Sequence, residues 1–341
     1  MRKHSGILSS KWGSNKLFCF VTYNFAIFEF YQSPTIMIQR KNENWFRMLF
    51  VWQGSVLPQI LPRLILLFIL SVVIVFFNGE LFNHKVPLNP APFTLFGIAL
   101  ALFLGFRNNA SYDRFWEGRK LWGALLNDTR SLARQCITMS GYAIDSKETT
   151  LFVNYLIAFT YALKHQLRYT DASADMHQWL PEELAKSMEN VKYKPIIIMK
   201  AMGQWVQTAK EEKKIDSIVQ VSFDESFSKL SHIVGGCERI ASTPIPYTYK
   251  VMLHRTVYLY CLLLPFGFVD SLGWMTPIVT IFIAYTFVAL EAIADEIEIP
   301  FGTHPNDLAL NAMSKNIEAT LLEMAERPVI FQAETDSLFI D

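Results

Sequence analysis

Three carboxylates near the end of the last apolar segment, Glu291, Asp295 and Glu298, have the spacing that places acids on one face of a helix. Grouped carboxylates can bind a metal ion, and within a membrane helix they can relay protons. Because these acids lie where the apolar segment ends, we expect them to have an interfacial role rather than a catalytic one.

Other side chains with catalytic potential are scattered along the chain. The seven histidines form no HxxxH or HExxH pattern, and no serine lies in a GxSxG sequence. A GxGxxG sequence and a Walker A loop are also absent. The cysteines have no CxxC pair and no metal-like spacing, which is typical of free thiols; they are Cys19, Cys136, Cys237 and Cys261. We therefore expect a protein that is not an enzyme and that carries no metal or cofactor.

A different function is indicated between Val86 and Phe106, a stretch without any charge that is long enough to span a membrane as a helix. A bulky apolar ridge repeats there at every fourth residue and consists of Ile98, Leu102 and Phe106. Beside it runs a stripe of small residues, Gly97, Ala101 and Gly105, which allows another helix to pack closely. The ridge faces lipid, a neighbouring helix or, if several copies surround an axis, a pore. The spacing alone does not decide between these three.

The composition is that of a membrane protein. Of 341 residues, 51% are hydrophobic and 14% aromatic, and the mean hydropathy is +0.21. Lys plus Arg and Asp plus Glu both number 31, so the overall charge gives no reason to expect a nucleic-acid partner.

The chain divides into five expected segments. Residues 1–36 form an N-terminal extension, expected to be poorly ordered, without the cleavage site of a secretory signal. The others are a first transmembrane hairpin (37–106), a water-facing helical region (107–250), a second hairpin (251–298) and a C-terminal segment (299–341). Basic residues flank all four spanning helices on one side, which predicts that both termini and the middle region are cytoplasmic, at a bacterial inner membrane.

The arrangement of two hairpins around a helical middle region resembles the bestrophin family, in particular its bacterial members. Three motifs carry the resemblance between Met37 and Glu326: GFRNNASYDRFWE after an apolar helix, IPYTY before the second hairpin, and PFG directly after the last spanning helix. The resemblance implies an all-α, funnel-shaped homopentamer around one central pore. It also implies that the second helix lines the narrow neck of this pore.

Carried over by residue, the three apolar rings of the family's neck correspond to Ile98, Leu102 and Phe106, which we call the neck residues. Leu102 departs from the Ile or Phe that is more common there. The resemblance also implies a second restriction on the cytoplasmic side, near EEKKIDS, for which Glu212 and Ile215 are the candidates. Animal bestrophins bind calcium through an acidic run after PFG. Here that run is THPNDL with only Asp307, so we expect no calcium site of the animal type.

The function indicated by this resemblance is passive conduction of small monovalent ions through an apolar neck, which blocks ions by expelling water. The expected partners are further copies of the chain, membrane lipid and the permeant ions. We expect monovalent cations such as sodium, as in bacterial relatives. The alternatives are an anion channel, since animal bestrophins pass chloride, and, from another class, a non-conducting membrane scaffold or carrier.

Overall fold

The computed structural model describes residues 37–38, 45–52, 54–81, 84–85, 88–329 and 339–340. The chain separates into two units, Met1–Thr35 and Ile36–Asp341, and the first lies wholly outside the described residues. The expectation of an N-terminal extension over residues 1–36 therefore also lies outside them. All the described helices and strands belong to the second unit.

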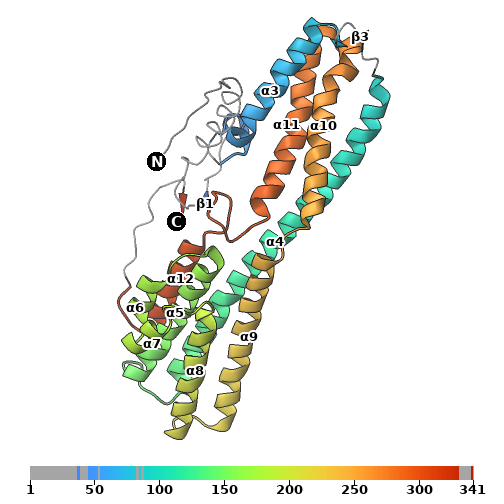
Figure 1. The fold of residues 1–341 in the computed structure, drawn as a ribbon. Coiled ribbons are helices and arrows are strands. Elements are labelled where there is room, and N and C mark those ends of the chain that lie inside the picture. Colours follow the sequence, from blue (N-terminus) through green and yellow to red (C-terminus); the bar gives the residue numbers. More distant parts are fainter. Residues whose placement is uncertain are drawn as a thin grey trace, which may run out of the picture. The chain divides into compact units, whose positions relative to one another are not determined.

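The described residues are overwhelmingly helical, as the sequence predicts (Figure 1). Among the residues that the structure describes, the only strands are four two-residue strands, which form two antiparallel pairs. They are β1 (Met37–Ile38) with β4 (Phe339–Ile340), and β2 (Glu80–Leu81) with β3 (His84–Lys85). A short helix, α2 (Trp45–Met48), precedes the first long one. The all-α fold class is confirmed.

The apolar group of helices comprises α3 (Leu57–Phe76), α10 (Tyr247–Leu272), α11 (Thr276–Ile297) and the first part of α4 (Pro90–Met139) up to Phe106. These helices pack side by side, with α11 against α3, α4 and α10 (Figure 1). Three described stretches are long and apolar enough to cross a membrane, and one of them, Tyr247–Ile297, contains both α10 and α11. A 3₁₀ turn, η2 (Gly273–Met275), joins those two helices.

The amphipathic group comprises the rest of α4 together with α5–α9 and α12. Their bounds are α5 (Lys147–Arg168), α6 (Ser173–Trp179), α7 (Glu182–Ser187), α8 (Lys194–Glu211), α9 (Ser217–Ser242) and α12 (Leu310–Met324). Helix α5 contacts α4, α6, α8, α9 and α12, and most of its residues from Phe152 to Leu163 are fully buried. The core of this group is therefore built around α5.

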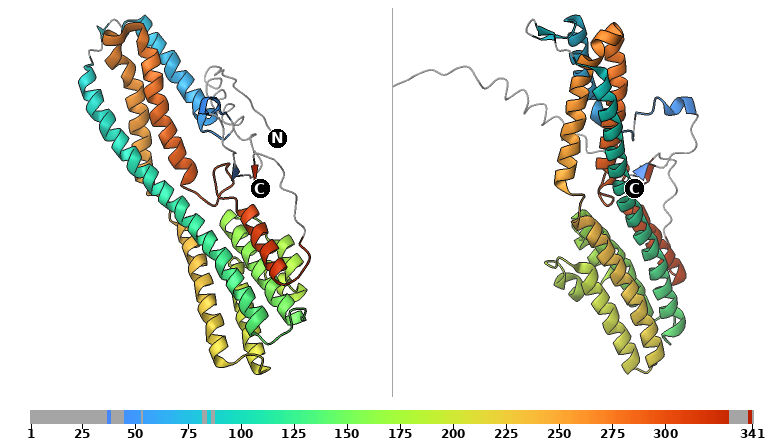
Figure 2. Two further views of the ribbon diagram at one scale, coloured as in Figure 1. Left: turned by 180° about the vertical axis from the view of Figure 1, so that it is seen from behind. Right: turned by 90° about the vertical axis from the view of Figure 1, so that its right-hand side faces the viewer.

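Helix α4 belongs to both groups (Figure 2). It begins where the Asn89 side chain accepts a hydrogen bond from the Ala91 N–H at 2.9 Å, with Pro90 in the first turn. Helix α4 has 50 residues, and no proline follows Pro92 in it. Its backbone hydrogen bonds therefore continue over a length of about 75 Å. The segment boundary expected at Arg107 thus falls inside one continuous helix.

Candidate functional site

The neck residues lie on an uncovered face of α4. Ile98 is 65% exposed, Leu102 55% and Phe106 56%. On the opposite face of the same turns, Leu100 and Leu104 are at most 2% exposed, because they pack into the core that α4 shares with α3, α10 and α11. One chain therefore buries one side of this apolar helix and leaves the bulky ridge unpaired.

The stripe of small residues beside the ridge has different surroundings at each position. A Cβ atom on Gly97 would lie 2.7 Å from the Tyr260 hydroxyl, so only glycine lets α10 approach here. Tyr260 is held in place because its hydroxyl donates to the Phe93 carbonyl at 3.2 Å. Ala101 is exposed, and a Cβ atom on Gly105 would meet no atom within 4 Å. Within one chain, only Gly97 makes the close contact that the stripe predicts.

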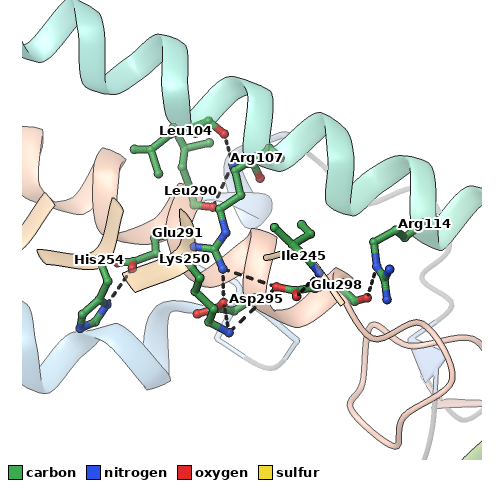
Figure 3. A network of polar contacts seen from close by, with 11 residues as sticks. Leu104, Arg107, Arg114, Ile245, Lys250, His254, Leu290, Glu291, Asp295 and Glu298 are labelled. Atoms are coloured by element: carbon green, nitrogen blue, oxygen red, sulfur yellow. Dashed lines mark hydrogen bonds and ion pairs between the residues drawn. The ribbon is translucent and has the colours of Figure 1, made fainter. Parts of the chain in front are cut away.

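The first charge after the neck, Arg107, is fully buried against the end of α11 (Figure 3). Its Nη2 donates to Asp295 Oδ1 and lies 3.6 Å from Glu298 Oε2. Lys250 Nζ also reaches Asp295 Oδ1, at 2.6 Å. Two cations and two carboxylates thus form one network, which offsets the cost of burying the Arg107 charge.

The third carboxylate considered in the sequence, Glu291, has its own partner. His254 Nδ1 lies 2.7 Å from Glu291 Oε1. Each of the three acids thus faces a basic side chain. Among the described residues no group of three or more His, Cys, Asp or Glu side chains has the arrangement of a metal site.

Two further side chains fasten α4 just beyond the neck. Asn108 Nδ2 donates to the carbonyls of Leu104 at 3.0 Å and Leu290 at 3.1 Å, which ties α4 to α11. Arg114 donates through Nε to the Glu298 carbonyl at 3.0 Å and through Nη2 to the Ile240 carbonyl at 2.7 Å. Arg107 and Asn108 are not among the site residues expected from the sequence, although Arg107 is the first charge after the apolar run.

The two candidates for the second restriction occupy different environments. Glu212 is exposed, and its Oε2 accepts a hydrogen bond from the Tyr142 hydroxyl at 2.6 Å. Ile215 is only 6% exposed and belongs to the core of the amphipathic group, so it cannot line a water-filled path as the chain is folded. The structure thus places Glu212 on the surface and Ile215 in the core. Ile218, in the first turn of α9, is the 80% exposed isoleucine of this segment.

The loop after PFG encloses Asp307. This carboxylate is 2% exposed, and its Oδ2 accepts the His304 N–H at 2.7 Å. A Cβ atom on Gly302 would lie 2.5 Å from the same oxygen, so a glycine is needed there. Burial raises the pKa of Asp307 to about 6.

Comparison with known families decides where this chain belongs. The family model described as "Bacterial/Fungal Bestrophin protein" matches residues 37–323, which is most of the chain. The chain belongs to the bestrophin family. The family expected from the sequence is thereby confirmed.

The sequences of bestrophin relatives align with this chain over nearly their whole length. A protein of Ralstonia nicotianae named as a voltage-dependent anion channel-forming protein is 47% identical over 304 residues, 89% of this chain and 99% of the relative. A protein of the same description from Escherichia coli K12 is 40% identical and covers 86% of this chain and 96% of its own. The crystal structure of a bestrophin homologue from Klebsiella pneumoniae matches with a TM-score of 0.73 at 42% identity, covering 79% of this chain and 99% of that one.

Proposed function

We propose that this bestrophin is a passive ion channel, in which copies of the chain surround one axis as a homopentamer and α4 lines the path. The observation that carries the proposal is the uncovered ridge of neck residues on a helix whose opposite face is buried. The relatives' names support a channel rather than an enzyme. A non-conducting scaffold or carrier does not agree with the names of these relatives, which describe channel-forming proteins.

The neck would act as a hydrophobic gate. Rings of Ile98, Leu102 and Phe106 side chains offer an ion no ligands, so a narrow neck expels water and stops conduction. Opening then requires the neck to widen until water enters. No atom of the same chain lies within 4 Å of a Cβ atom built on Gly105, so this chain does not block movement at that position.

The permeant ion is the point at which we change the expectation from the sequence. The relatives are named as anion channel-forming proteins, which favours small anions such as chloride over the cations that we expected. The neck residues themselves carry no charge and so favour neither sign. We therefore propose anion conduction, with sodium-like cations as the alternative outcome of the test.

Location and assembly complete the proposal. The apolar helices are those of a membrane protein. We propose the bacterial inner membrane, four crossings and cytoplasmic termini, because the basic residues collect at one end of the apolar segments. We also propose Ile218, in place of Ile215, as the residue of the second restriction, and we expect no activation by calcium.

The test is the reversal potential of the purified protein in lipid bilayers under asymmetric potassium chloride. Leu102→Ala and Phe106→Ala should raise the conductance several-fold, because each removes bulk from the neck. Leu66→Ala, which truncates a 69% exposed leucine of α3, is the matched control and should conduct as wild type does. Unchanged conductance in both neck variants would remove these residues from the path, and a steep response to micromolar calcium would contradict the calcium expectation.

A further inference from the structure

Beyond Phe106, the exposed face of α4 continues as a polar surface. Asp113 follows Phe106 by seven residues, which on a helix is about 20° short of two full turns and about 10 Å further along the axis. It follows Leu102 by eleven residues, about 20° past three turns. Asp113 therefore lies between the directions of these two neck residues, and its side chain is exposed.

Two basic side chains near Asp113 in the sequence, Arg107 and Arg114, point elsewhere. Arg107 is 1% exposed and pairs with Asp295, and Arg114 donates to the carbonyls of Glu298 and Ile240. The side chain of Asp113 forms no hydrogen bond or ion pair with any other described residue. The chain thus withdraws these two arginines into its own contacts and leaves Asp113 exposed, without a partner among the described residues.

The charges further along include one acid, Glu117, and three basic side chains. Glu117 Oε1 lies 3.9 Å from Arg239 Nη2, and the exposed Arg119 lies about 100° around the helix from Leu102. Glu117 Oε2 and Lys120 Nζ form an ion pair at 2.8 Å. Asp113 is therefore the first exposed charge beyond Phe106 on the face that carries the neck residues. Since this charge lies about one Debye length from Phe106, it acts on ions that enter or leave the neck.

We propose that Asp113 lowers the preference of the pore for anions over cations. This inference rests on the proposed function, because the symmetry of the channel converts one exposed carboxylate into a ring with one carboxylate from each copy. Such a ring attracts partly hydrated monovalent cations and repels anions at the polar end of the neck. Because the neck residues favour neither sign, this ring acts on the permeability ratio of the channel without competing with a charge in the neck.

The first experiment measures the chloride-to-potassium permeability ratio from reversal potentials in a potassium chloride gradient. Asp113→Asn should raise this ratio by about threefold or more, and Asp113→Lys should raise it further. Glu183→Gln removes an exposed carboxylate of α7 that also has no partner among the described residues, and it should leave the ratio unchanged. An Asp113→Asn channel with the wild-type ratio would overturn the proposal.

A second experiment changes the charge at this position after assembly. Asp113→Cys is made in a Cys19→Ser background, because Cys136, Cys237 and Cys261 are buried and Cys19 lies outside the described residues. A cationic methanethiosulfonate should raise the permeability ratio, and an anionic one should return it towards wild type. Mass spectrometry verifies that labelling is complete. If the fully labelled channels do not show opposite shifts of the permeability ratio, Asp113 lies outside the path.

The outcomes separate this inference from the function on which it rests. If wild-type protein carries no current, the proposed channel fails. If wild type conducts and the Asp113 variants keep its ratio, only the role of Asp113 fails. The remaining case is that the Asp113→Asn variant does not assemble, which native mass spectrometry detects. Loss of the oligomer would show that Asp113 is an interface residue and would overturn the proposal.

Discussion

The two parts of α4 are buried to very different extents. In the apolar group, the ridge of neck residues is more than half exposed, and only the side towards α10 and α11 is covered. In the amphipathic group, Trp122, Leu125 and Leu132 of the same helix are fully buried among α5, α9 and α12. One chain thus completes the packing of its amphipathic group and leaves the apolar group open along one face.

This difference separates stability from conduction. Residues of the enclosed part contribute to the free energy of unfolding through the apolar area they bury. The uncovered neck residues bury little in one chain, so their side chains are available to ions, lipid or another copy. Substitutions in the two parts should therefore affect different measurements.

The largest expected effect is in the core of the amphipathic group. Phe152→Ala should lower the free energy of unfolding by about 4 kcal/mol, because Phe152 is fully buried and its ring lies 4.5 Å from that of Trp205. Phe106→Ala, at 56% exposure, should change stability far less while it changes conductance. Thermal unfolding in detergent checks both, and equal losses of stability would refute the comparison.

At the junction of the two groups, Arg107→Met should lower the free energy of unfolding by about 3 kcal/mol. The change leaves Asp295 and Glu298 with only Lys250 to balance two carboxylates. The double variant Arg107→Met, Asp295→Asn should regain part of the loss, because it restores the charge balance. A single variant as stable as wild type would show that the network contributes nothing to joining the groups.

The connection between α11 and α12 should make stability depend on pH through Asp307. Its pKa is about 6 in the folded chain and 3.8 when unperturbed, so the fold keeps a proton that the unfolded chain releases. The contribution is fully present below about pH 4 and is lost as the pH rises to about 6, by roughly 2 to 3 kcal/mol. Thermal unfolding between pH 4 and 7 should show this fall in wild type and in Asp145→Asn, and it should be absent in Asp307→Asn.

The smallest effect distinguishes the covered glycine from the uncovered one. Gly97→Ala should destabilise the chain by about 1 kcal/mol, because its Cβ would press on the Tyr260 hydroxyl. Gly105→Ala has open space and should be slightly stabilising, since alanine favours a helix over glycine. Thermal unfolding measures both changes. If Gly105→Ala instead prevents assembly, as judged by native mass spectrometry, a second copy packs on that face.

Local patterns in the sequence predicted the helices well. The uncharged apolar run after Arg63 indicated α3, and the repeat at every fourth residue placed the neck residues on one face of α4. The same patterns suggested a boundary at Arg107, because polarity changes there. Helix formation does not follow polarity: no proline interrupts α4 beyond Arg107, so the helix continues.

Local patterns do not predict the polar network around Arg107, because the residues that form it are far apart in the sequence. Arg107 and Asp295 are 188 residues apart, and no spacing in the sequence indicates that they meet. The burial of Ile215 likewise depends on a local turn that its neighbours in the sequence do not indicate. Asp216 caps α9 by accepting the N–H groups of Ile218 and Val219, and this turn directs Ile215 into the core.

The continuity of α4 has a mechanical consequence. A helix without a hinge transmits twist, so a rotation of its amphipathic end reaches Phe106 with little loss. The neck residues of one chain are fixed to the same helix and must turn together. A change in the amphipathic group would therefore shift the positions of Ile98, Leu102 and Phe106 at once rather than one after another.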